Sequence, residues 1–260
     1  MTGNRSHSKV KPRTSKELKL LIYDCIEKFG PNCDLNFIDV SGIKTMDDLF
    51  SGVNSAFNGD ISGWDVSRVV TMRDMFYGSL FNGDISGWNV SGVTSMEAMF
   101  MGSEFTGDIS NWDVSRVENM ESMFRDSRFN GDISRWDVSN VEWMQCMFAN
   151  SQFNGNISQW DVSNVCDANA MFAGSQFLGD ISDWALPKDA FVLDMFLESV
   201  MELKGLIPAW HKKMREDPDR ESYWWWTPGC EDVYSDIDET ENEQPDCEPP
   251  TEEELENLPF

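Results

Sequence analysis

Histidine is almost absent from this 260-residue chain, which has only His7 and His211. None of its six cysteines forms a Cys-x-x-Cys pair, and no apolar run approaches the roughly 20 residues of a transmembrane helix. The shortage of histidine and the cysteine spacing argue against a zinc site and against a paired-histidine mechanism. We therefore expect reduced thiols, no cofactor and no membrane insertion.

Basic residues are scarce as well, since 20 Lys and Arg face 46 Asp and Glu, which gives a net charge of −26. Residues 231–260 alone contain thirteen acidic side chains and no Lys or Arg. Such a chain repels phosphates and anionic lipids, so we expect neither nucleic acid nor a membrane surface as a partner. The basic N-terminus also lacks the apolar segment of a signal peptide, so the sequence by itself predicts a cytoplasmic protein.

Tryptophan, by contrast, is present at a strict period. Six tryptophans stand 24 residues apart, namely Trp64, Trp88, Trp112, Trp136, Trp160 and Trp184, and residues 131–154 show the repeated phrase as GDISRWDVSNVEWMQCMFANSQFN. A fixed period of this size indicates stacked coils, in which each unit buries its apolar side only against its neighbours. Because identical residues on every coil form ladders and not a unique catalytic constellation, we predict that the protein is not an enzyme.

Each repeat has two parts. In Phe-Asn-Gly-Asp-Ile-Ser-x-Trp, the aromatic residue and Ile are four apart and share one face of a strand. In Ser-x-Val-x-x-Met-x-x-Met-Phe, the apolar spacing favours a short helical or 3₁₀ turn, with Ser67, Ser91, Ser115, Ser139 and Ser163 as N-caps. We therefore predict an α/β solenoid, a right-handed stack of about seven coils with a parallel sheet on one face and helical turns on the other. The columns that start at Phe57, Ile61, Met75 and Phe76 and recur every 24 residues should form its core.

The two ends differ from the repeat. Thr14 and Glu17 have the spacing of a capping box, helical apolar spacing follows to Phe29, and Gly30 and Pro31 end the pattern. We expect a disordered basic leader at residues 1–13, a capping helix at 14–34 and the repeat solenoid at 35–200. Residues 201–229 should form a C-terminal cap, and residues 230–260 a disordered acidic tail.

The phrase M-x-x-M-F-x-x-S-x-F-N-x-D-I-S-x-W-D-V-S-x-V is very similar to the repeat of BspA-like leucine-rich-repeat surface proteins, the mycoplasma-lipoprotein-associated type. Residues 14–18 and 34–41 resemble that family's lead-in to its first coil. The resemblance covers about residues 14 to 212. It implies a leucine-rich-repeat-like fold, a location at the cell surface, and a role in adhesion or protein binding without catalytic residues.

Stacked acidic residues are the first candidate site. One column holds Asp60, Asp84, Asp108 and Asp132, and continues to Asp180 with Asn156 in the gap; a second starts at Asp65. These carboxylates would bind calcium as oxygen ligands, or would form Asx-turns with the Ser two residues on. We favour the turns, because Asn replaces Asp in each column. A further column of asparagines, Asn58, Asn82, Asn130 and Asn154, predicts a ladder that hydrogen-bonds neighbouring backbone.

Positions where the repeat varies are the second candidate site. Trp143 occupies an otherwise polar column, and another variable column contains Tyr77, Met101 and Arg125. Arg128 and Arg135 are further candidates, which together with Arg125 supply a local positive patch on the same coil region. The aromatic run Trp224, Trp225 and Trp226 either caps the solenoid or binds a partner. The sequence thus predicts a monomeric scaffold that binds a protein. The alternative is an acidic inhibitor, immunity protein or nucleic-acid mimic that acts through its tail and surface.

Overall fold

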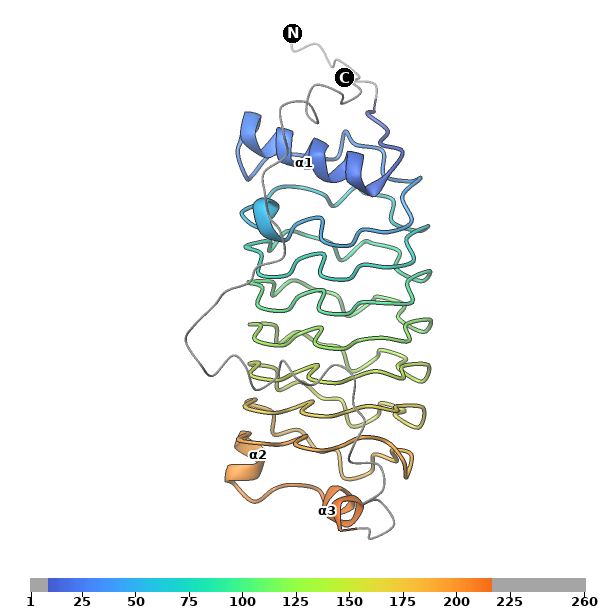
Figure 1. Ribbon diagram of the computed structural model, residues 1–260, viewed down its shortest axis with the longest axis vertical. Helices are drawn as coiled ribbons and strands as arrows, with labels where there is room; N and C mark the ends of the chain where they lie inside the picture. Colours follow the sequence, from blue (N-terminus) through green and yellow to red (C-terminus); the bar gives the residue numbers. More distant parts are fainter. Residues whose placement is uncertain (1–8, 217–260) are drawn as a thin grey trace.

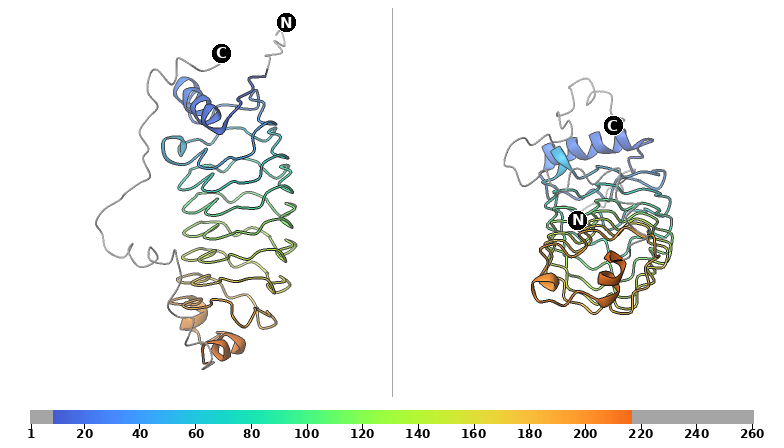
Figure 2. Two further views of the ribbon diagram at one scale, coloured as in Figure 1. Left: turned by 45° about the vertical axis from the view of Figure 1, so that its right-hand side comes forward. Right: turned by 60° about the horizontal axis from the view of Figure 1, so that its bottom comes forward.

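The computed structural model describes residues 9–216. The chain winds into a stack of coils, with one helix across the first coil and two short helices at the other end (Figure 1; Figure 2). The described elements are α1 (Ser15–Phe29), the 3₁₀ helix η1 (Gly52–Asn54), α2 (Val200–Leu203) and α3 (Ala209–Arg215). No helix within residues 9–216 has the length and hydropathy that crossing a membrane would require.

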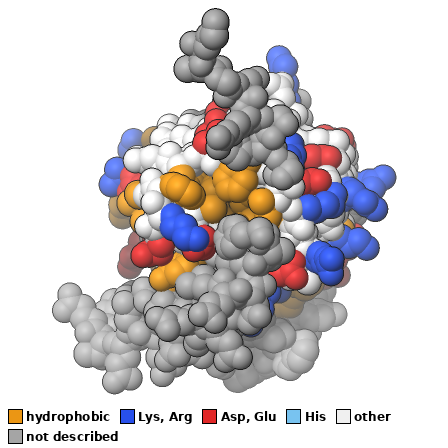
Figure 3. Space-filling view, turned by 90° about the horizontal axis from the view of Figure 1, so that it is seen from above, with side chains coloured by type: hydrophobic (Ala, Val, Ile, Leu, Met, Phe, Trp, Pro, Cys, Tyr) orange, Lys and Arg blue, Asp and Glu red, His pale blue; other side chains and the backbone are white. Residues whose placement is uncertain are grey.

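Helix α1 has the termini that the sequence predicts. The Thr14 hydroxyl oxygen accepts a hydrogen bond from the Glu17 N–H at 3.1 Å, and the Gly30 N–H donates to the Ile26 carbonyl at 2.8 Å. Gly30 has a φ of 85°, which favours glycine at this position. The helix buries Leu18, Leu21, Ile22 and Cys25 against the core of the stack. Seen from this end, hydrophobic side chains gather in the middle and charged side chains surround them (Figure 3).

The predicted fold class is wrong. Residues 9–216 contain no strand, so there is no parallel sheet and the chain is not an α/β solenoid. Neighbouring coils share single parallel bridges, which run from Thr45 through Thr71, Ser95, Asn119, Trp143 and Asp167 to Phe191. These bridges lie in the stretch that we predicted to be helical, and residues 57–199 contain no helix. The leucine-rich-repeat architecture implied by the resemblance fails on the same grounds.

Overlapping β-turns replace the predicted helix. In the coil that starts at Phe57, the N–H groups of residues 75, 77 and 79 donate to the carbonyls of residues 72, 74 and 76 within the same coil. The N–H groups of residues 72, 74, 76 and 78 donate to the carbonyls of residues 95, 97, 99 and 101 on the next coil, at 2.8 to 3.0 Å. This alternation satisfies the backbone without a helix or a strand. Turns and helices share a three-residue apolar spacing, which explains the wrong prediction.

Left-handed residues make these turns possible. Asp74 has a φ of 52° and Gly78 a φ of 61°, each at the third position of a turn, where a type II turn needs a positive φ. The same conformation recurs one coil later at Ala98 and Gly102 and continues along the stack. Because a positive φ interrupts both extended and right-handed helical backbone, this column is incompatible with the predicted elements.

The stretch that we predicted to be a strand is also built from turns. The Asp60 carboxylate accepts hydrogen bonds from the N–H of Ser62 at 2.9 Å and from its hydroxyl at 2.7 Å. The Trp64 N–H then donates to the Ile61 carbonyl at 3.1 Å. Likewise, Ser67 donates to the Asp65 carboxylate and does not cap a helix. Asx-turns therefore set the backbone where the alternating pattern indicated an extended chain.

The core columns are those that the repeat predicts. Phe124 is fully buried and stacks on Phe100 and Phe148, with ring centroids 5.7 and 5.8 Å away. The indole N–H of each of the six repeat tryptophans donates to a carbonyl on the preceding coil, as from Trp136 to Ile109 at 3.1 Å. The ladder continues beyond the repeats, because Trp210 of α3 donates to the Ile181 carbonyl at 2.9 Å. The tryptophans thus join successive coils, and α3 closes the far end of the stack.

Candidate interaction surface

The turns create one face whose side chains differ from coil to coil. We call it the turn face, and define it as the outward side chains of residues 70–80 and of their equivalents on later coils. Within this segment Met72, Met75 and Phe76 point into the core and are fully buried, whereas Arg73 and Tyr77 are exposed. The inward positions repeat and the outward positions vary, so the chemistry of the turn face changes along the stack while its backbone does not.

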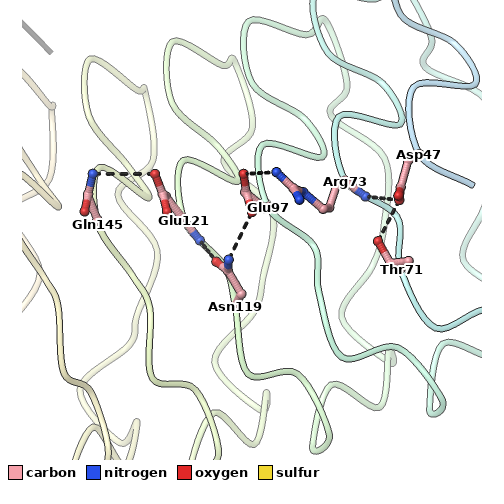
Figure 4. A network of polar contacts seen from close by, with 7 residues as sticks. All are labelled: Asp47, Thr71, Arg73, Glu97, Asn119, Glu121 and Gln145. Carbon is pink, nitrogen blue, oxygen red and sulfur yellow. Dashed lines mark hydrogen bonds and ion pairs between the residues drawn. The ribbon is translucent and has the colours of Figure 1, made fainter. Parts of the chain in front are cut away.

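A chain of polar contacts runs along the turn face (Figure 4). The Asp47 carboxylate accepts hydrogen bonds from the Thr71 hydroxyl at 2.6 Å and from the Arg73 N–H at 2.9 Å. The Arg73 guanidinium pairs with Glu97 on the next coil at 2.7 Å. Three successive coils are thereby tied together by side chains as well as by backbone.

The contacts continue on the following coils. Asn119 donates to the Glu97 carboxylate at 3.1 Å and accepts from the Glu121 N–H at 2.8 Å, while Gln145 approaches Glu121 at 3.5 Å. Burial raises the pKa of Glu121 to about 7, with Glu97 and Asp167 adding to the effect and Arg73 opposing it. Burial also raises the pKa of Asp74 to about 6, and the negative charge of the nearby Asp48 is the second cause. The turn face therefore has carboxyl groups that change charge near neutral pH.

The structure places five of the predicted contact residues on the turn face. Trp143 is 44% exposed and Tyr77 is 39% exposed, whereas Met101 is partly buried. The Arg125 side chain is largely buried and pairs with the neighbouring Asp126 at 3.2 Å. Trp143 and Tyr77 are thus available as contacts, while Arg125 is already engaged within the molecule.

The fifth, Arg128, lies at the edge of the turn face, and Arg135 lies outside it. Arg128 is exposed and pairs with Glu104 at 2.9 Å, at the end of the turn segment. Arg135 lies among the Asx-turns, in the part of the coil between Ile133 and Trp136, so the three arginines do not form one basic patch. Trp224, Trp225, Trp226 and the acidic tail lie outside the described residues.

Sequence reasoning missed the polar chain and two exposed apolar residues near Tyr77. Val70 is 43% exposed and Leu80 is 56% exposed. A signal for the polar chain was present, because the column Arg73, Glu97, Glu121 places charges at a 24-residue period. The column alone does not show which residues meet, because the contacts Arg73–Asp47 and Asn119–Glu97 join residues 26 and 22 apart, and these offsets depend on the backbone turns.

The acidic columns form Asx-turns. The carboxylates of Asp84, Asp108 and Asp132 each accept the N–H of the Ser two residues on, as Asp60 does, and these hydrogen bonds lower the pKa of each carboxyl. Asn156 makes the same contact with Ser158 at 3.1 Å. Within residues 9–216 no group of three or more His, Cys, Asp or Glu side chains is arranged to hold a metal ion. Calcium binding by Asp60, Asp84, Asp108 and Asp132 stays an untested alternative.

The predicted asparagine ladder is present. The side-chain oxygen of Asn58 accepts the N–H of Asn82 on the next coil at 2.8 Å, and Asn130 makes the same contact with Asn154. These asparagines are exposed, and they hydrogen-bond through the oxygen of the side chain. The Asn and Asp columns therefore both accept hydrogen bonds from backbone N–H groups, and the turn face is the remaining candidate interaction surface.

Comparison with protein-family models gives a match over residues 22–128 and a second, overlapping match over residues 101–210. Together they cover most of the chain, including all six tryptophan repeats. The chain belongs to the family described as Mycoplasma protein of unknown function, DUF285. This DUF285 assignment supports a mycoplasma-type repeat family, and it does not support the leucine-rich-repeat type that we predicted. Comparisons of this DUF285 protein with curated proteins and with solved structures gave no match.

Proposed function

We propose that this DUF285 protein is a non-enzymatic scaffold that binds a protein partner through its turn face. The observation that carries the proposal is the exposure of aromatic and aliphatic side chains where the repeat varies. Trp143 and Tyr77 are 44% and 39% exposed on a backbone that every coil holds in the same turns. Trp and Tyr are the side chains most often found as energetic anchors in protein interfaces.

The rigidity of the turn face favours this role. Its backbone N–H groups are bonded from coil to coil, and the Asp47, Arg73 and Glu97 contacts fix side chains on the coils around Tyr77. A partner would meet a surface that is already ordered, so little conformational entropy is lost on binding. Because the repeat also resembles that of BspA-like surface proteins, we further propose that the partner is a protein bound during adhesion.

An acidic inhibitor or nucleic-acid mimic is the second candidate. The observation that favours it is the exposed column of Asx-turn carboxylates at Asp84, Asp108 and Asp132, whose pKa values lie below the usual range. They are ionised at neutral pH and repeat once per coil. This form of binding would be electrostatic and would weaken steeply as salt is added, whereas binding through Trp143 and Tyr77 would not.

The test is affinity capture with the full chain, followed by measurement of the dissociation constant of the captured protein. Trp143→Ala and Tyr77→Ala should each weaken binding about tenfold or more, because truncating an anchor costs roughly 2 kcal/mol. Arg135→Ala is the matched control, since Arg135 is exposed but lies among the Asx-turns. Equal binding by all three variants would refute the turn face as the site, and strong salt dependence would favour the acidic candidate.

A further inference from the structure

Trp143 lies among acidic residues on the turn face. The Glu118 carbonyl accepts the N–H of Glu142 at 2.8 Å and that of Trp143 at 3.2 Å, so the backbones of these three residues meet at one oxygen atom. Glu118 and Glu142 are exposed, and Trp143 is 44% exposed. Trp143 also shares a parallel bridge with Asp167 on the next coil. An exposed indole ring thus has acidic residues beside it on its own coil and on both neighbouring coils.

The electrostatic effects on nearby groups agree with this arrangement. On the next coil, burial raises the pKa of the Cys166 thiol, and the negative charge of Glu142 is the second cause. On the preceding coil, burial raises the pKa of Glu121, and the negative charge of Glu97 is the second cause. The potential is therefore negative on both sides of Trp143.

The carboxylates nearest Trp143 in the chain are not neutralised by a neighbouring cation. The arginines of the turn face have acidic partners elsewhere, namely Glu97 for Arg73, Asp126 for Arg125 and Glu104 for Arg128. No ion pair within residues 9–216 uses Glu118 or Glu142. The surface around Trp143 is complementary to a positive charge that the described part of the chain does not supply.

An organic cation suits this surface better than a metal ion. In the part of the chain that the structure describes, acidic, His and Cys side chains nowhere gather in threes to hold a metal. An arginine guanidinium group binds over the face of an indole ring within about 6 Å of its centre, and its several N–H groups also pair with carboxylates. Trp143 supplies the ring, and Glu118 and Glu142 supply the carboxylates.

We propose that Trp143 receives an arginine side chain of the partner, which stacks on the indole ring while Glu118 and Glu142 pair with its guanidinium group. This inference rests on the proposed function, because it names the chemistry of the partner at the same surface. Exposed ion pairs contribute little by themselves, so the ring supplies most of the contact and added salt weakens the binding only in part. Binding at the acidic columns would depend on charge alone.

Short peptides test the proposal on the full-length protein. The probes are acetyl-Gly-Arg-Gly-amide and the same peptide with citrulline in place of arginine, which keeps the shape of the side chain and removes its charge. Binding is followed through the indole N–H resonance of Trp143 in NMR spectra, assigned as the resonance that Trp143→Phe removes. The arginine peptide should shift this resonance in a saturable way, and the citrulline peptide should not. The readout is local, so peptide bound elsewhere on the acidic chain does not register.

Two double variants sharpen the test. Glu118→Gln with Glu142→Gln should weaken binding of the arginine peptide about threefold or more, because two ion pairs are lost while the ring remains. The matched control is Asp65→Asn with Asp113→Asn, which removes the same amount of charge from the Asx-turns. Asn89 already makes such a turn with the residue two further on, so this control keeps its fold and should bind the peptide as the wild type does.

Three results would overturn the inference: no shift with the arginine peptide, an equal shift with the citrulline peptide, or equal affinity of the two double variants. Each of them leaves the proposed function standing if the captured protein still requires Trp143. Wild-type binding of the captured protein by Trp143→Ala would instead overturn the proposed function, and this inference with it.

Discussion

Gly78→Ala tests the left-handed turns that replace the predicted helix and strand. Gly78 has a φ of 61°, and no heavy atom lies within 4 Å of the position that an added Cβ would occupy. Its N–H donates to the Met101 carbonyl on the next coil at 2.8 Å. The substitution therefore adds a methyl group to open space, and its effect depends on the backbone conformation alone.

The expected magnitude follows from two opposing effects. Holding Ala in the left-handed region costs roughly 1–2 kcal/mol. Replacing Gly also restricts the unfolded chain, which returns about 0.4–1 kcal/mol of stability. The net result should be a loss of about 0.5–1 kcal/mol. Had this segment been helical, Ala would have stabilised it by about 1 kcal/mol relative to Gly, so the sign of the effect distinguishes the two structures.

Urea unfolding followed by tryptophan fluorescence measures this difference, with the slope of the transition checked for each variant. Gly87→Ala is the matched control, because Gly87 also has no heavy atom near the added Cβ but does not have a positive φ. It should be neutral or slightly stabilising. Stabilisation of similar size by Gly78→Ala and Gly87→Ala would refute the left-handed turn at residue 78.

Three further predictions follow from the core, the turn face and the Asx-turns. Trp136→Phe removes the indole hydrogen bond to the Ile109 carbonyl and some buried area, so urea unfolding should show that the free energy of unfolding falls by about 1–3 kcal/mol. A fall no larger than that caused by Trp143→Phe at an exposed position would contradict the tryptophan ladder. Glu121→Gln should stabilise the protein at pH 8 but not at pH 4, because the carboxyl has a pKa near its ordinary value of 4.5 in the unfolded chain and of about 7 in the folded protein. After allowance for partial exposure, the gain at pH 8 is about 1 kcal/mol. Thermal melts in which the stability difference between variant and wild type does not change with pH would rule this out. Asp108→Asn should leave the melting temperature nearly unchanged with or without calcium, because Asn156 already makes the same turn; a calcium-dependent rise that only the wild type shows would establish a metal site instead.

The sequence predicts the packing of this protein better than its backbone. Period and residue type identify the buried columns, since Phe57, Ile61 and Phe76 recur every 24 residues and apolar side chains are buried whatever the local conformation. The capping box at Thr14 likewise locates the start of α1. The turns were not predictable from spacing, because residues three apart share a side in a helix and in overlapping β-turns alike.

The left-handed column was hidden for a different reason. Gly78 and Gly102 suggest a positive φ, but the equivalent positions on the next two coils hold Asp126 and Asn150, and Ala98 and Ser122 adopt the same conformation elsewhere in the turn. Asp and Asn are enriched in the left-handed conformation, but Ala and Ser are not, so the column as a whole does not indicate it. Hydrogen bonds between coils hold them there, and such bonds connect residues about 24 apart.

The candidate site was predictable only in part. Trp143 stands out because it interrupts a polar column and Tyr77 because its column varies, and both are exposed in the structure. The polar chain from Asp47 through Arg73 to Glu97 depends on which residues face one another across coils, and this required the correct backbone. The arginine patch failed because Arg125, Arg128 and Arg135 lie in different environments and two of them have acidic partners.

The central claim is that the turn face binds and that the remaining repeat holds the stack together. The most direct measurement is the dissociation constant of the captured partner for Trp143→Ala beside Arg135→Ala, with thermal melts to show that both variants are folded. We predict weakening of about tenfold or more for Trp143→Ala and wild-type binding for Arg135→Ala. Wild-type binding by Trp143→Ala together with a loss for Arg135→Ala would contradict the claim and place the interaction on the Asx-turns.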